Sequence, residues 1–270
     1  EPGKIAVIYK ENKFGDELIK LFKHRDIAAY SKRSINLLDI PLAKKLIQLL
    51  EYLAAEHDTP YGGDEMLFEI LHFDFFNIPP IEIAKLSVEV AEKQFTENKT
   101  SIRKLLLEKA NQQPRDLFDA GVHPSLKAAA PIIEKLIADS VNVTLQNLLE
   151  NIIRKAGVLS TIMNGDEKIW LLQVLTAFFD FVKEETRRNP DLTVGGLVRN
   201  IQLMKDNNVP VPLAQVGGSD KGVNLLTAHG SKGLEFEYVF LAGSNASLWE
   251  KKRKPSGGYK FPDTIFSSKP

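Results

Sequence analysis

Hydrophobic positions at the start of the chain follow strand and helix periods in turn. Apolar runs at 4–10 and 27–31 predict two strands, and the segment between them, 15–25, predicts a helix with one apolar face. The longer segment 39–58 carries leucines at helical spacing after Pro41, which suits the first turn of a helix. The chain therefore begins as an α/β domain does.

The middle of the chain, from residue 61 to about residue 208, has helical periodicity almost throughout. The predicted helices cover 64–73, 80–95, 100–110, 124–140, 144–157, 166–189 and 193–207. Several begin with a residue that can cap the free amides of a first turn, namely Asp64, Thr144, Asp166 and Thr193. This block is predicted to be all-α.

Strand character returns after the Pro- and Gly-containing stretch 210–222, with apolar runs at 223–228 and 238–243. Strands need partners in a common sheet, so the simplest reading is one α/β domain with a partial parallel sheet, interrupted by a large all-α insertion. The expected α/β domain comprises 1–58 and 216–270, and the inserted helical domain 59–215. Three separate small domains are the alternative.

Composition narrows the functional classes. Lys+Arg and Asp+Glu both number 35, so a uniformly cationic nucleic-acid-binding surface is excluded and such binding would need a local cluster. There is no cysteine, and the five histidines lack metal-ligand spacing, so we expect neither disulfides nor a metal held by this chain. The absence of cysteine favours a cytoplasmic setting, and no apolar run reaches the roughly 20 residues that cross a bilayer, so we expect no membrane contact. The start at Glu1 suggests a piece of a longer protein.

Polar side chains and glycines follow the strand predicted at 223–228. His229, Lys232 and Glu235 surround Gly230 and Gly233. Ligands of α/β proteins bind at the carboxyl ends of strands, where glycines let backbone amides approach a phosphate. Lysine supplies a cation, glutamate accepts from a sugar hydroxyl, and histidine can donate to a nucleic-acid backbone. The alternative is an ordinary turn with solvated side chains.

The order of these residues adds a family resemblance. The run T-A-H-G-S-K-G-L-E-F at 227–236 resembles the fifth motif of the UvrD/Rep-type superfamily one DNA helicases. The run I-A-V-I-Y-K-E-N at 5–12 is similar to their fourth motif, I-A-V-L-Y-R-x-N, with Lys10 in place of the arginine. Lysine keeps the charge but lacks the planar fork that grips phosphate. In this family a helical subdomain interrupts the second RecA-like domain between these two motifs, so the resemblance also accounts for the insertion.

The resemblance implies roles for single residues. Tyr9 would stack on adenine, Lys10 would face the terminal phosphate of ATP, and Glu235 would hold the ribose beside Gly233. The DNA-binding residues implied are Thr227, His229, Ser231 and Lys232, with Thr227 and His229 foremost. Taken alone, Tyr9 is more simply interpreted as a strand-end aromatic that packs on the core.

The implied parent protein is an ATP-dependent 3′-to-5′ DNA helicase that acts in repair or recombination on single-stranded or duplex DNA. The sequence contains no G-x-x-x-x-G-K-[ST] loop, so we expect a first motor domain elsewhere in the parent to hold ATP and magnesium, and this fragment alone to be inactive. A nuclease domain or subunit is a further expected partner. The alternatives are a non-catalytic, helicase-derived module that binds DNA or protein, and a stand-alone helical binding protein.

Three other features have simpler explanations. The aromatic run 73–76 is predicted to be core rather than a base-stacking platform. The basic run 251–254 is typical of a solvated loop, with a DNA backbone contact as the second reading. Arg187 and Arg188 close a predicted helix, where cations favour the terminal carbonyls.

Overall fold

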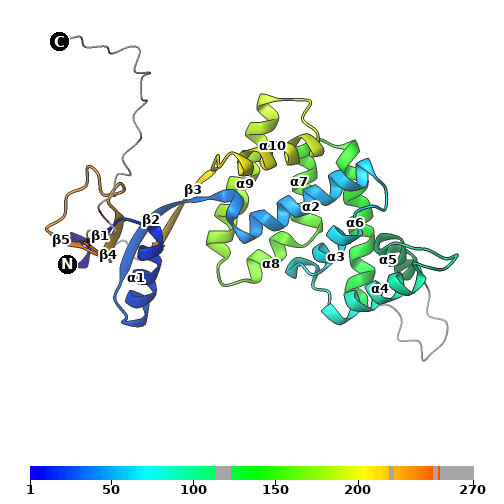
Figure 1. Cartoon of the computed structure of the whole chain (residues 1–270), viewed down its shortest axis with the longest axis horizontal. Coiled ribbons are helices and arrows are strands. Elements are labelled where there is room, and N and C mark those ends of the chain that lie inside the picture. Colours follow the sequence, from blue (N-terminus) through cyan, green and yellow to red (C-terminus); the bar gives the residue numbers. More distant parts are fainter. Residues whose placement is uncertain (113–122, 219–221, 246–248, 250–270) are drawn as a thin grey trace, which may run out of the picture. The chain divides into compact units, whose positions relative to one another are not determined.

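The computed structural model describes all residues except 113–122, 219–221, 246–248 and 250–270. The basic run 251–254 therefore lies outside the described residues. The chain divides into two compact units, an α/β unit of residues 1–34 and 214–270 and a helical unit of residues 35–213 (Figure 1). The predicted fold class, a parallel-sheet domain interrupted by an all-α insertion, is confirmed.

Within the described residues, five strands form one sheet in the order β3-β2-β4-β1-β5. Their bounds are β1 Ile5–Tyr9, β2 Ala29–Asn36, β3 Pro212–Gly218, β4 Val223–Thr227 and β5 Tyr238–Leu241. The pairs β2–β4, β4–β1 and β1–β5 are parallel. Strands from both ends of the chain thus share one sheet, which excludes three separate domains.

Helix α1, Asn12–His24, covers one face of this sheet. Its apolar side, which carries Phe14, Leu18, Ile19 and Phe22, packs on the buried cluster of Val7, Tyr9, Val223 and Leu225. Because β1 and β4 run in parallel, their carboxyl ends lie at the same edge, beside the start of α1. The fold therefore brings the two sequence motifs to one edge of the sheet.

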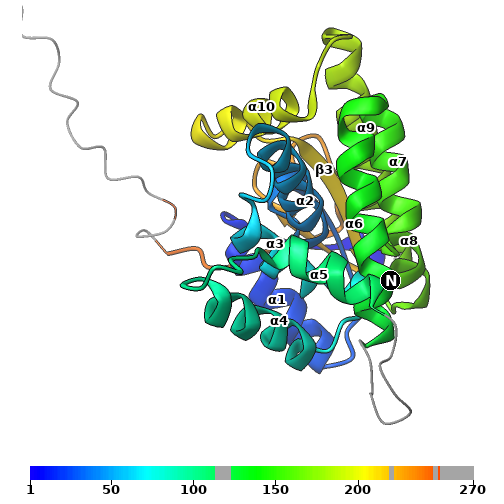
Figure 2. The same ribbon diagram turned by 90° about the vertical axis from the view of Figure 1, so that its right-hand side faces the viewer.

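The helical unit consists, among the described residues, of nine α-helices and short 3₁₀ turns around one core (Figure 2). The helices are α2 Pro41–Asp58, α3 Asp64–Leu71, α4 Pro80–Lys93, α5 Ile102–Asn111, α6 Pro124–Asn142, α7 Leu145–Lys155, α8 Val158–Asn164, α9 Lys168–Arg188 and α10 Val194–Asp206. Their apolar stripes meet in a continuous interior.

Helix α2 lies at the centre of the helical unit, where it packs against α3, α6, α9 and α10. Its leucines, such as Leu46, Leu50 and Leu53, are buried in the helical core. The sequence predicts this helix as part of the α/β domain, within 1–58. The structure instead divides the units after residue 34 and before residue 214, because α2 finds its apolar partners among the helices that follow it.

Two of the four expected helix caps form. The Thr144 hydroxyl accepts from the Asn147 amide at 3.4 Å, and the Thr193 hydroxyl accepts from the Gly196 amide at 3.1 Å. Asp64 does not cap α3: it occupies the first helical position, and its carboxylate accepts from the Ile102 amide at 2.8 Å, an interaction between distant segments. Asp166 precedes Glu167, which is the N-cap residue of α9 and makes no side-chain cap bond.

The aromatic run is confirmed as core. Phe73, Phe75 and Phe76 are all buried in the helical unit, and Phe73 and Phe75 meet edge to face with ring centroids 5.4 Å apart. Such packing leaves no aromatic face for a base.

The chain passes into and out of the helical unit through one polar clasp. The Asn36 side-chain oxygen accepts from the Val211 amide at 2.9 Å and from the Leu38 amide at 3.3 Å. The Leu37 amide donates to the Val211 carbonyl at 2.8 Å. The first and last residues of the insertion are thus held side by side.

A buried ionic cluster, formed by Glu56, Arg103 and Glu134, joins α2, α5 and α6. Arg103 donates to Glu56 at 2.6 Å and makes two bonds to Glu134 at 2.6 and 2.8 Å. The Glu56 side chain is 0% exposed and also accepts from the Tyr61 and Gly63 amides. These carboxylates, Glu134 first, raise the pKa of Arg103, so the guanidinium remains charged.

Candidate functional site

The candidate site is the edge of the sheet where β1, β4 and β5 end. Tyr9 at the end of β1 is in register with Thr227 at the end of β4. The Ala228 amide donates to the Tyr9 carbonyl at 2.8 Å, and the Ala242 amide donates to the Ile8 carbonyl at 2.9 Å. The segment that begins at Lys10 and the loop that begins at Ala228 therefore leave the sheet side by side.

A small hollow of ≈ 170 Å³ opens at this edge, against the first turn of α1. Its lining consists of Lys10, Glu11, Lys13, Phe14, Glu17, Ala242 and Gly243. Glu11, the N-cap residue of α1, makes no side-chain cap bond, and no acidic residue occupies the first turn. The positive end of the helix dipole and two lysines meet at the hollow and favour an anion such as phosphate, whereas Glu11 and Glu17 in the same lining oppose one.

Tyr9 is buried and does not line the hollow. The residue is 1% exposed, and its ring packs so closely on α1 that a Cβ at Gly15 would come within 2.3 Å of it. A glycine at position 15 is what permits this approach. In this arrangement the Tyr9 ring offers no open face for adenine, and stacking requires the ring to leave its place in the core.

The loop from residue 228 to residue 237 is folded by its own hydroxyl groups. The Thr227 hydroxyl accepts from the Gly230 amide at 3.0 Å, and the Ser231 hydroxyl donates to the Ala228 carbonyl at 3.1 Å. Gly233 has a φ of +83°, in the region that favours glycine. Thr227 and Ser231 thus shape the loop in the structure, whatever contacts they make with a ligand.

The remaining side chains of the loop project outward. His229, Lys232 and Glu235 are all exposed, and none of them lines the hollow beside Lys10. The structure therefore brings Lys10 and this loop to one edge of the sheet but separates them into a hollow of mixed charge at the start of α1 and an exposed polar loop. Lys4 braces the end of the loop through an ion pair with Glu237 at 2.5 Å.

Of the residues that line the hollow, the sequence motifs indicate Lys10 alone, and two of the others, Lys13 and Gly243, were within reach of prediction. Lys13 is the second residue of α1, and Gly243 lies just after β5. A signal for both existed, because residues just after a strand and in the first turn of the next helix are the usual ligand contacts of α/β folds. The motif comparison drew attention to Lys10 instead.

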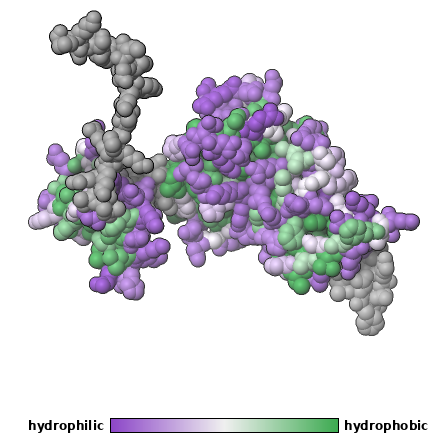
Figure 3. Space-filling model, viewed as in Figure 1, coloured by the Kyte–Doolittle hydropathy of each residue, from purple (hydrophilic) through white to green (hydrophobic). Residues whose placement is uncertain are grey.

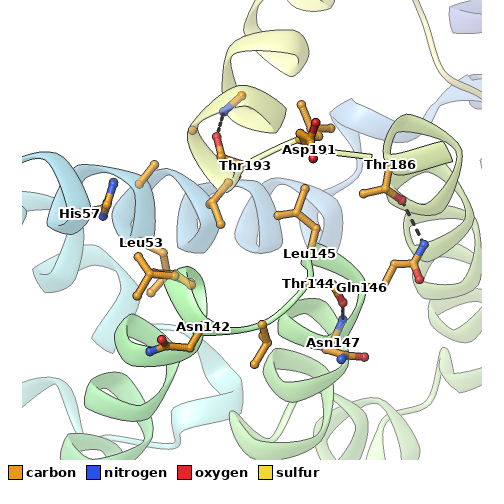
Figure 4. A pocket seen from close by; sticks show the side chains of 18 of the residues that line it. Leu53, His57, Asn142, Thr144, Leu145, Gln146, Asn147, Thr186, Asp191 and Thr193 are labelled. Carbon is orange, nitrogen blue, oxygen red and sulfur yellow. Dashed lines mark hydrogen bonds between the residues drawn. The ribbon is translucent and has the colours of Figure 1, made fainter. Parts of the chain in front are cut away.

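A second concave surface lies wholly within the helical unit (Figure 4). This cleft of ≈ 1240 Å³ is lined by the end of α2, the α6–α7 turn, the end of α9 and the start of α10. The Thr144 and Thr193 caps lie on its walls, and Gln146 donates to Thr186 at 3.0 Å. Lysine and arginine side chains alternate there with Asp58 and Asp191, so the lining has no single charge.

Arg187, in the wall of this cleft, illustrates the balance. Its guanidinium forms a hydrogen bond of 2.8 Å with Glu184 and lowers the pKa of that carboxyl to about 2. The positive charge is thus already matched on its own helix. Mixed charge of this kind favours neither a nucleic acid nor an acidic ligand.

Other classes of site are absent from the described residues. In those parts of the chain, no group of three or more His, Asp or Glu side chains is placed to hold a metal ion. A search of the described helices finds none with the length and apolar character of a membrane span.

Comparison with known proteins identifies a family for the chain. The model of the UvrD-like helicase C-terminal domain matches residues 1–254, which include the first outer segment, the whole helical unit and most of the second outer segment. No curated protein matches the chain. Since that model covers most of the sequence, the chain belongs to the family of UvrD-like helicase C-terminal domains.

Proposed function

We propose that this chain supplies one wall of the ATP site and part of the DNA track of an ATP-dependent 3′-to-5′ DNA helicase. The observation that carries the proposal is the convergence of the Lys10 hollow and the 228–237 loop at one edge of the sheet. ATP, when bound with magnesium against a first motor domain, would supply the free energy for stepping along single-stranded DNA in repair or recombination. The setting proposed is the cytoplasm, where ATP and DNA meet.

In this proposal Lys10 attracts the terminal phosphate at the α1 N-terminus, and Lys13 adds a second cation there. Glu235 accepts hydrogen bonds from the ribose hydroxyls. Gly233 gives the loop the positive backbone angle that presents Glu235 to the sugar. His229 and Lys232, which are exposed, contact DNA phosphates, and Thr227 and Ser231 position them by holding the loop. Tyr9 stacks on adenine only if its ring turns out from under α1.

The site of phosphate contact is tested by DNA-stimulated ATP hydrolysis in the intact protein. We expect Lys10→Ala to lower kcat/KM for ATP by about tenfold to a hundredfold, because a charge-assisted phosphate contact is worth about 1.5–3 kcal/mol. Lys20→Ala is the matched control: Lys20 is exposed on the same helix and lies outside the hollow. Equal activity of both variants would remove Lys10 from the site.

A second candidate is a non-catalytic module that retains the helicase fold and binds DNA or protein. It is favoured by the burial of Tyr9 and by the lysine at position 10 where the family has arginine. The same assay separates the two functions. A folded, DNA-binding intact protein that hydrolyses no ATP would support the module, and hydrolysis that DNA stimulates would support the motor.

A further inference from the structure

Helix α4 has two apolar faces, of which only one is used by the core. Ile83 and Leu86 point inward and are buried. On the opposite side Ile81 is 61% exposed and Val88 57%, and Phe95, two residues beyond the end of the helix, is 92% exposed. Figure 3 shows hydrophobic residues gathered over this part of the helical unit. So much exposed apolar surface on one helix indicates a docking face.

The spacing of this outer stripe is that of a helix pair. Ile81, Val88 and Phe95 are seven residues apart, and the exposed alanines Ala84 and Ala91 occupy the intervening positions. These are the first and fourth places of successive heptads, which face the partner in paired helices. Alternation of large and small side chains lets two such stripes interlock. Within α4 the stripe runs from Ile81 to Ala91, about 15 Å of helix, and Phe95 continues the spacing in the turn that follows.

The charges beside the stripe identify the occupant. Lys85 lies three residues before Val88 and Glu92 four residues after it, on the same flank. If two copies of α4 pair antiparallel about a two-fold axis at Val88, each Lys85 meets the partner's Glu92. The same axis places Ile81 against the partner's Phe95. We propose that the outer face of α4 is a self-association surface that takes α4 of a second copy of this chain in antiparallel orientation.

In the isolated chain, Lys85 and Glu92 remain accessible for ion pairs with a second copy. Lys85 is bonded only locally, to Glu82 three residues away at 2.6 Å, and its side chain is 65% exposed. Among the described residues, Glu92 forms no ion pair. Because the two copies are related by a two-fold axis, the Lys85–Glu92 ion pair occurs twice, as in any isologous interface. One pair of four-turn helices buries less than the roughly 1,200 Å² of a stable interface, so we expect weak, reversible association.

Sedimentation equilibrium of the intact protein tests the charge pairing. We expect Lys85→Glu and Glu92→Lys each to raise the dimer dissociation constant by about tenfold, because like charges then face each other across the axis. The double variant restores opposite charges at the two positions, and its dimer dissociation constant is expected to return to the wild-type value. Circular dichroism of each variant confirms that α4 still folds.

Three outcomes of this experiment overturn the proposal. A wild-type protein that stays monomeric into the high micromolar range has no such surface. Single variants that dimerise like wild type show that another face is used. A double variant no better than either single variant contradicts the antiparallel arrangement.

Cysteine trapping gives an independent readout of orientation, and this chain contributes no cysteine that would compete with the introduced one. Position 88 lies on the proposed axis, so the Val88→Cys protein is expected to form a disulfide between the introduced cysteines of two copies. A mixture of Ile81→Cys and Phe95→Cys proteins should cross-link, and Ile81→Cys alone should not. Cross-linking of Ile81→Cys to itself would indicate parallel helices and refute the proposal, as would failure of the mixed pair.

Discussion

The buried ionic cluster of the helical unit should tolerate loss of its cation poorly. We predict that Arg103→Met lowers the free energy of unfolding by about 3–5 kcal/mol, the usual cost of leaving a buried charge without its partner. The structure supports a value in this range because Glu56 is 0% exposed and would keep only two backbone donors. Glu134, which is 30% exposed, would turn to water and add little.

For a unit of this length such a loss corresponds to a fall in Tm of about 6–20 °C. Urea unfolding followed by circular dichroism measures it, since helices dominate the signal. Lys104→Met, at the exposed neighbouring position on α5, is the control and should stay within about 0.5 kcal/mol of wild type. Adding Glu56→Gln to Arg103→Met removes the orphaned charge and should recover part of the loss. A loss below about 1 kcal/mol for Arg103→Met would refute the reasoning.

Three further changes test local features. Gly233→Ala should destabilise the α/β unit by about 1–2 kcal/mol, because φ is +83° at this position, and urea unfolding measures the loss. Gly195→Ala, in α10 where an added Cβ meets nothing within 4 Å, should stabilise the helical unit by about 0.5 kcal/mol in the same assay. Hydrogen bonds from Lys109 and, to a lesser extent, Lys93 lower the pKa of Glu89. The ionised Glu89 therefore stabilises the folded state at pH values above the pKa of an unfolded carboxyl group, and this stabilisation is lost as the pH falls through the lower pKa of the folded state. The stability difference between wild type and Glu89→Gln should accordingly be about 0.2–1 kcal/mol at neutral pH and shrink toward zero in acid; a difference that grows in acid contradicts this sign.

Periodicity anticipated most elements because their apolar stripes are long. The segment 39–58 appears as α2 and the segment 166–189 as α9, each within two residues of the expected bounds. Helix α8, Val158–Asn164, was missed because seven residues are too few to reveal a helical period. Strand β3 was missed because its proline and two glycines are typical of loops, and its place beside β2 depends on tertiary pairing.

The candidate site was predictable in outline and not in detail. Motif order and parallel pairing were enough to bring Lys10 and the loop after Thr227 to one edge. The burial of Tyr9 depends on how closely α1 approaches the sheet, and the position of Lys13 depends on how that helix is rotated. Neither the approach nor the rotation of α1 can be predicted from the local pattern of residues.

The clasp at Asn36 and Val211 makes the helical unit an interchangeable module. Since β2 and β3 are neighbours in the sheet and the clasp joins their inner ends, everything between the two residues occupies the place of a hairpin loop. Lengthening such a loop costs little entropy once its ends are fixed. Evolution can therefore enlarge, trim or replace the inserted helices while the strands keep their register, and a protein engineer can graft a different helical block, or a two-residue turn, at the same junction.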